Sequence, residues 1–214
     1  MSDTDSIAPV EPAVCIDFKN PKAYLALAPT LALEQSIGVQ FDWLPIAVAG
    51  LTRPPDARPD EDRGTRHRRL RAEYNDRDLR RYARVYGIEL GELYRNPDVS
   101  LASMGLLWAK RGRHDAQRRY LQVVFERLFG GRLDVENSAA IASILAEVDV
   151  ETVGWDAYVA GAGRRSFDAT CAALRERGVF DVPAYLVAGD VFFGRQHLPM
   201  IRWLLDGKRG EPPL

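Results

Sequence analysis

The sequence has few cysteines and histidines, and they are widely spaced. Its 214 residues include two cysteines, Cys15 and Cys171, and no Cys-x-x-Cys pair. We therefore expect neither a secreted disulfide framework nor a dithiol oxidoreductase. The three histidines have no second histidine or cysteine at the spacing of zinc ligands, so no metal site is predicted.

Long apolar runs and an N-terminal targeting pattern are also absent. No apolar stretch approaches the roughly 20 residues that a membrane-spanning helix needs, so no membrane partner is predicted. Residues 1–12 carry acidic side chains and no basic one, unlike a signal peptide, and we interpret them as a flexible tail. Together with the cysteine usage, this predicts a cytoplasmic protein.

Neither sign of charge is in excess. The 29 Lys and Arg residues nearly balance 30 Asp and Glu, and the formal net charge is −1. Basic residues concentrate between Arg63 and Arg84, but acidic residues are interleaved with them, which favours a solvated helix face over a nucleic-acid patch. No nucleic-acid partner is predicted. With 46% apolar residues, the chain can bury a full core and is not a disordered protein.

The N-terminal part of the chain has a strand–helix–strand pattern. A short apolar run predicts a buried strand at 13–18. Asn20 and Pro21 then form a helix start, with Asn at the N-cap and Pro at the first helical position. Pro29 lies inside this helix and predicts a kink or a split. A second strand is expected at 39–44.

The rest of the chain is largely helical. Residues 66–158 have a helical pattern with short breaks, which predicts four to six helices. The elements expected after this block are a helix at 166–177 closed by Gly178, a hairpin of strands at 184–187 and 190–193, and a last helix at 197–205.

Without the helical block, the order of elements is β-α-β followed by α-β-β-α. Parallel strands need a crossover and antiparallel strands a short turn, so the first half is a βαβ unit and the second half ends in a hairpin. This is the thioredoxin topology. We therefore predict an α/β protein with a thioredoxin-like fold and an inserted all-helical domain. The predicted thioredoxin-like domain is discontinuous, formed by 13–58 and 163–209, and the inserted domain is 59–162.

Several stretches between Val14 and Leu205 match the motifs of one group of proteins. They are Asp17–Leu25 (DFKNPKAYL), Thr52–Pro55 (TRPP), Arg71–Arg81 (RAEYNDRDLRR) with Tyr86–Ile88 (YGI), and Gly178–Tyr185 (GVFDVPAY) with Phe192–His197 (FFGRQH). On these stretches the chain resembles the 2-hydroxychromene-2-carboxylate isomerases and the kappa-class glutathione transferases, which are DsbA-like thioredoxin-fold proteins.

The resemblance implies that the start of the first helix holds a thiolate. In those families a serine hydroxyl there holds the thiolate of bound glutathione, and Asn20 stands at this position. Unpaired N–H groups and the positive end of the helix dipole favour an anion at such a place. Asn20 is interpreted either as a helix cap alone or as a cap whose amide also donates to the thiolate. The charge of Lys22 could lower the pKa of a bound thiol.

The resemblance also implies a set of ligand contacts. Pro183 is expected to be cis, which leaves the backbone of Val182 free to pair with a peptide ligand. Arg71 stands for a lysine and could hold a carboxylate, while Thr52 replaces asparagine and Gln196 replaces aspartate. The residues assigned to glutathione binding are Thr52, Arg71, Tyr74, Asp78, Val182, Pro183, Arg195 and Gln196.

The function implied by the resemblance is a glutathione-dependent isomerase that acts on a small aromatic or conjugated carboxylic acid. Two alternatives remain open: a kappa-type glutathione transferase, and a non-catalytic thioredoxin-fold binding protein that has lost the glutathione site. The relatives are homodimers, so a homodimer is expected here. Cys15 and Cys171 fall in apolar segments and are expected to be inert buried thiols.

Overall fold

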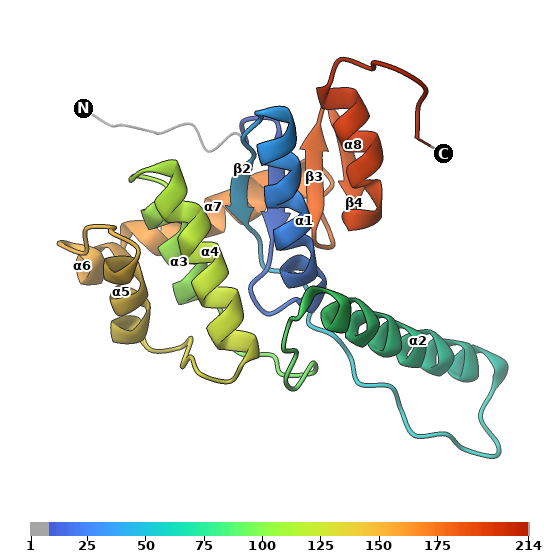
Figure 1. Cartoon of the computed structure of the whole chain (residues 1–214). Helices are drawn as coiled ribbons and strands as arrows, with labels where there is room; N and C mark the ends of the chain where they lie inside the picture. The colour runs from blue at the N-terminus through green and yellow to red at the C-terminus, as the bar shows by residue number, and fades with distance from the viewer. Residues whose placement is uncertain (1–8, 214) are drawn as a thin grey trace.

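The protein is built on a four-stranded mixed sheet (Figure 1). The computed structural model describes residues 9–213. The strands are β1 (Ala13–Ile16), β2 (Asp42–Pro45), β3 (Ala184–Val187) and β4 (Asp190–Phe193), in the order β2-β1-β3-β4. The two central strands, β1 and β3, are buried along their whole length, as expected for strands covered on both faces.

The predicted βαβ unit is confirmed. β1 and β2 are parallel and are joined by α1 (Pro21–Ile37), whereas β3 is antiparallel to both β1 and β4. The second strand begins three residues later than predicted, at Asp42, and includes Pro45. A proline is tolerated there because β2 is an edge strand with one side unpaired.

Helix α1 starts as predicted but is not split at Pro29. The Asn20 side chain caps its first turn, and Gly38 ends the helix with a φ of 67°. The helix runs unbroken through Pro29. Buried side chains on either side of the proline, among them Leu25 and Leu33, hold both halves in the core. Tertiary packing therefore outweighs the hydrogen bond that proline cannot donate.

The C-terminal half also follows the prediction. Helix α7 (Ala162–Glu176) precedes β3, and the β3–β4 turn places Ala188 and Gly189 at φ 54° and 86°. Positive φ at both turn residues is typical of a two-residue type I′ hairpin. A short 3₁₀ turn, η1 (Arg195–His197), leads into α8 (Leu198–Leu205). In Figure 1, α1 and α8 lie in front of the sheet and α7 lies behind it.

Five helices separate β2 from α7, within the predicted range of four to six. They are α2 (Arg63–Tyr86), α3 (Ser100–Ala109), α4 (His114–Phe129), α5 (Ser138–Glu147) and α6 (Trp155–Ala160). One hydrophobic core runs from the sheet into α3, α4 and α5. Helix α2 projects away from this body (Figure 1), and its C-terminal half packs Leu79 and Ala83 against Leu25 of α1. The domain boundaries proposed from the sequence stay a prediction.

The arginine-rich segment is a solvated helix face, as its mixed charges predict. Along α2, Arg69 contacts Glu73 at 2.7 Å and Arg80 contacts Asp76 at 3.0 Å. These acids neutralise part of the basic charge on the helix. The observed ion pairs are i,i+4 contacts of the kind that stabilise an exposed helix.

The predicted flexible tail is only partly described. Residues 1–8 lie outside the described residues. Of the rest, the Val10 N–H donates to Asp42 of β2 at 3.4 Å. The Glu11 carboxylate accepts the Gly189 N–H at 2.9 Å and pairs with Arg177. Val10 and Glu11 are therefore bound to the sheet domain and do not form a free tail.

Candidate functional site

The start of α1 and the cis-proline segment meet at one end of the sheet. In the β1–β3 register, Cys15 lies opposite Ala184, so the residues that follow β1 and those that precede β3 share this end. The Val182–Pro183 bond is cis, as expected from the resemblance. The Pro183 carbonyl accepts the Gly194 N–H at 2.8 Å, which joins the segment before η1 to the same place.

Asn20 is a helix cap in this structure. Its Oδ1 accepts the Lys22 N–H at 3.0 Å, and its own backbone N–H donates to the Asp17 carbonyl at 3.0 Å. The residue is 4% exposed. The hydrogen bonds among residues 9–213 use the Asn20 Oδ1 atom as an acceptor, and none of them uses its Nδ2 group as a donor. The capping role is confirmed, and a contact to a thiolate stays a prediction.

The buried carboxylate of Asp17 fixes the loop that leads into α1. It accepts the N–H groups of Lys19 at 3.1 Å and Val48 at 3.0 Å. Burial raises the pKa of Asp17, whereas the Val48 N–H and the Lys19 ammonium oppose that rise. Asp17 thereby ties the end of β1 to the segment after β2 and holds the start of α1 in place.

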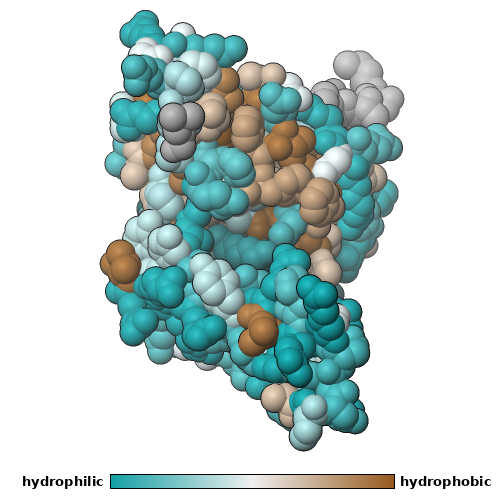
Figure 2. Space-filling model, turned by 90° about the vertical axis from the view of Figure 1, so that its right-hand side faces the viewer, coloured by the Kyte–Doolittle hydropathy of each residue, from teal (hydrophilic) through white to brown (hydrophobic). Residues whose placement is uncertain are grey.

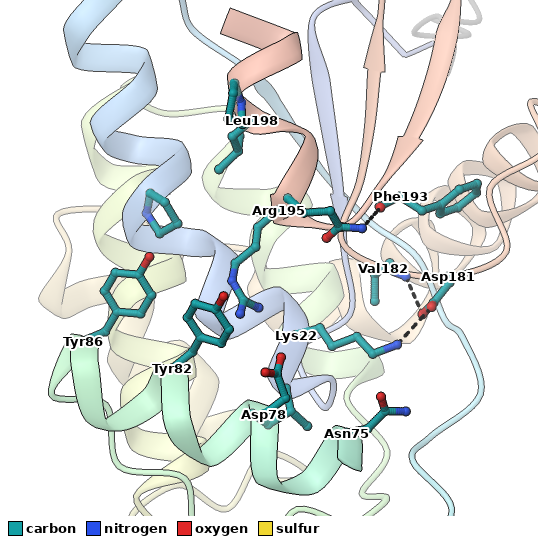
Figure 3. A pocket seen from close by; sticks show the side chains of 15 residues that line it. Lys22, Asn75, Asp78, Tyr82, Tyr86, Asp181, Val182, Phe193, Arg195 and Leu198 are labelled. Carbon is teal, nitrogen blue, oxygen red and sulfur yellow. Dashed lines mark hydrogen bonds and ion pairs between the residues drawn. The ribbon is translucent and has the colours of Figure 1, made fainter. Parts of the chain in front are cut away.

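Asp181 occupies the position that a peptide ligand was expected to take. One of its carboxylate oxygens accepts the Val182 N–H at 2.8 Å, and the other accepts from Lys22 Nζ at 3.1 Å (Figure 3). The expectation that the Val182 N–H is free is therefore wrong for this state of the protein.

A pocket of about 580 Å³ opens beside these residues, between α2 and the body of the protein. Figure 2 shows the hollow, with a hydrophilic floor, between the upper body and the lower part formed by α2. Its volume lies within the range of ligand sites, about 300–1,000 Å³. The lining residues used below are Lys22, Pro29, Asn75, Asp78, Tyr82, Tyr86, Asp181, Val182, Arg195, Gln196, Leu198 and Pro199.

The structure brings together four of the residues assigned from the resemblance. Asp78, Val182, Arg195 and Gln196 all line the pocket. Asp78 is paired with Arg81 of its own helix at 2.8 Å. The Gln196 amide donates to the Phe193 carbonyl at 2.8 Å, so its NH₂ group is directed to the backbone.

Three assigned residues do not line the pocket. Thr52 is exposed on the loop before α2, and Arg71 and Tyr74 are exposed on the N-terminal half of that helix. Tyr74 is 54% exposed. Their assignment to ligand binding stays a prediction that this arrangement does not support. Pro183 adjoins the pocket through its neighbour Val182.

Sequence reasoning missed the other polar and aromatic residues that α2 directs into the pocket. These are Asn75, Tyr82 and Tyr86, which with Asp78 lie on one face at spacings of three, four, seven and eleven residues. That periodicity is visible in the sequence. Once Asp78 was assigned to the site, this periodicity could have identified the other three residues.

The two cysteines are buried and free, as predicted. Burial raises the pKa of Cys15 to about 12 and also raises that of Cys171. Neither thiol ionises near neutral pH, so neither is a nucleophile at the site.

The structure also bears on metal binding and on membrane crossing. Among residues 9–213, no group of three or more His, Cys, Asp or Glu side chains could hold a metal ion. No helix in the same range has the length and apolar character needed to cross a membrane.

The chain is similar to two kinds of known protein. Over 193 residues it is 26% identical to a Pseudomonas putida protein named 2-hydroxychromene-2-carboxylate isomerase, covering 86% of this chain and 89% of that protein. A solved 2-hydroxychromene-2-carboxylate isomerase has a TM-score of 0.67 at 21% identity, with 92% of both chains covered. A probable DsbA oxidoreductase from Streptomyces coelicolor has a TM-score of 0.64 at 17% identity, covering 94% of this chain and 92% of that one.

The likeness to these structures shows the shared fold. The family described as the DSBA-like thioredoxin domain matches residues 15–206, which include the second half of β1, the other three strands and every residue of the candidate site. The protein therefore belongs to the DSBA-like thioredoxin domain family.

Proposed function

We propose that the protein is a glutathione-dependent isomerase that acts on a small aromatic or conjugated carboxylic acid. One observation carries the proposal: Lys22, at the Asn20-capped start of α1, and Val182, before β3, line one pocket together with two tyrosines and Arg195. The similarity to a protein named 2-hydroxychromene-2-carboxylate isomerase supports the reaction class.

The residues present fit glutathione on its thiol side. The positive end of the α1 dipole and the Lys22 ammonium favour a negative charge at this place, while the Lys22 N–H is bonded to the Asn20 side chain. When bound, glutathione supplies a thiolate that can add to an electron-poor conjugated carbon and leave again. The fit on the peptide side requires the Asp181 carboxylate to move away, because it now accepts the Val182 N–H.

The chain's own residues then have distinct tasks in the proposed reaction. The start of α1 and Lys22 stabilise a negatively charged sulfur. Tyr86 offers a ring face to an aromatic substrate and reduces its contact with water. Holding both reactants in one pocket replaces a bimolecular encounter by an oriented one.

A non-catalytic binding protein is the second candidate, and specific contacts favour it. Asp181 takes the Val182 N–H, and Gln196 offers a neutral amide where the family has an aspartate for the ligand's ammonium group. Both features weaken the recognition of glutathione and leave the pocket itself intact. A kappa-type transferase remains the third candidate, because it would use the same thiolate position.

The test is conversion of 2-hydroxychromene-2-carboxylate, followed by ultraviolet absorbance and chromatography. We expect conversion with reduced glutathione and none with S-methylglutathione, which lacks the thiol. Accumulation of a stable thioether would instead identify a transferase. Binding of the acid without conversion under either condition would favour the binding protein.

A further inference from the structure

All but one of the charged side chains that line the pocket form an ion pair. Four ionisable groups other than tyrosine line it: Lys22, Asp78, Asp181 and Arg195. Lys22 and Asp181 pair with each other at 3.1 Å. Asp78 pairs with Arg81 at 2.8 Å. Among residues 9–213, no carboxylate lies within ion-pair distance of the Arg195 guanidinium, so the pocket keeps one unmatched positive charge.

Arg195 is held in an extended position across the pocket. Its guanidinium carbon lies 3.9 Å from the centre of the Tyr82 ring, so the side chain reaches from η1 to α2 (Figure 3). The backbone behind it is fixed, because the Gly194 N–H donates to the Pro183 carbonyl at 2.8 Å. A cation over a tyrosine ring gains from the ring quadrupole, which stabilises this orientation.

A guanidinium stacked on a ring keeps its N–H groups free at the edge. Those donors form a planar fork that matches the two oxygens of a carboxylate. Apolar groups line the same pocket: the Tyr86 ring, Pro29 of α1, and Leu198 and Pro199 at the start of α8. A ligand that satisfies both features is a flat aromatic acid whose carboxylate faces Arg195.

We propose that Arg195, positioned by Tyr82, forms a carboxylate-binding subsite for a small aromatic acid. The subsite deepens the proposed function, on which it rests for the role of the acid as a substrate. It also replaces Arg71 as the carboxylate anchor, since Arg71 is exposed and does not line the pocket. Binding at the subsite does not require glutathione.

The experiment measures binding of trans-cinnamate and of its neutral amide, cinnamamide, by titration calorimetry without any thiol. We expect the wild type to bind the acid at least about 10-fold more tightly than the amide, as a charge-assisted bidentate contact implies. Arg195→Gln should remove that preference, and Arg195→Lys should keep part of it because the charge remains without the fork. Tyr82→Leu should weaken acid binding less than Arg195→Gln does.

The matched control is Arg77→Gln, which removes an exposed arginine of α2 that does not line the pocket. It should change acid binding less than about twofold by the screening of exposed charges. Circular dichroism and melting show whether each variant is folded. Equal binding of acid and amide by the wild type, no measurable acid binding, or an undiminished preference in folded Arg195→Gln overturns the subsite.

The two proposals fail in different ways. Selective binding of the acid that depends on Arg195, without any conversion of 2-hydroxychromene-2-carboxylate, would support the subsite and contradict the isomerase proposal. Thiol-dependent conversion with an unchanged KM in Arg195→Gln would leave the isomerase and reject the subsite.

Discussion

Replacing Asp181 by alanine should tighten the binding of glutathione. A peptide ligand that pairs with the Val182 N–H has to displace the Asp181 carboxylate, which now accepts that N–H at 2.8 Å and pairs with Lys22 at 3.1 Å. Alanine removes the competing carboxylate without the added backbone freedom of glycine. The ligand then meets an unoccupied N–H and an unpaired ammonium group.

The expected gain follows from the two contacts that are lost. A hydrogen bond of this kind contributes about 0.5–1.5 kcal/mol net. The Lys22 and Asp181 side chains are 36% and 42% exposed, so their ion pair contributes no more than about 0.2–1 kcal/mol. The sum is about 0.7–2.5 kcal/mol, which corresponds to an affinity about 3- to 70-fold higher.

Titration calorimetry with reduced glutathione measures this difference. Asp181→Asn is the intermediate case, because its amide oxygen can still accept the Val182 N–H but the pair with Lys22 is lost. Asp168→Ala is the control of equal charge change, since Asp168 is exposed on α7 at the opposite face of the sheet. If Asp181→Ala binds glutathione no more tightly than the wild type, or Asp168→Ala gains as much, the competition argument is wrong.

Three further predictions concern stability and reactivity. Asn20→Ala should lower the free energy of unfolding by about 1 kcal/mol in urea denaturation, while Asn20→Ser should restore most of it; equal stability of all three proteins would contradict the capping role. Glu34→Ala should cost about 1–3 kcal/mol in the same assay, because the buried Phe41 N–H, which donates to Glu34 at 2.7 Å, would lose its acceptor; unchanged stability would contradict this role. Iodoacetamide at mildly alkaline pH should modify Cys15 and Cys171 in urea but not in the folded protein, as intact mass spectrometry would show; rapid labelling of folded protein would contradict the raised pKa values.

The fold could be predicted because its signals are local and agree with one another. The Asn20-Pro21 helix start, the Gly178 helix end and the two-residue turn at 188–189 each specify their own conformation. Pro29 misled the prediction, since a helix interior penalises proline locally while the surrounding core holds both halves of the helix together.

The site was harder to predict because it depends on pairings between distant segments. Asp181 and Lys22 are 159 residues apart in the chain, and their ion pair requires the cis-proline segment to lie beside α1. The contact between Arg195 and Tyr82 likewise depends on how far α2 projects from the body. Motif matching assigned Arg71 and Tyr74 to the site by their positions in the chain, but the α2 residues that line the pocket begin at Asn75 and extend to Tyr86.

The architecture separates two properties that the family's motifs combine. A preference for an anion at the start of α1 arises from the helix dipole, whereas Pro21 offers no N–H and the Asn20 side chain accepts the Lys22 N–H. The side chain at position 20 determines the source of the thiolate. A cysteine there would itself ionise, whereas Asn20 can only cap the helix and donate a hydrogen bond to the thiolate of a bound ligand. The choice of acid would then be made on the other side of the pocket, by α2 and Arg195, which belong to different elements. Loss of glutathione binding would therefore not by itself abolish recognition of an aromatic acid.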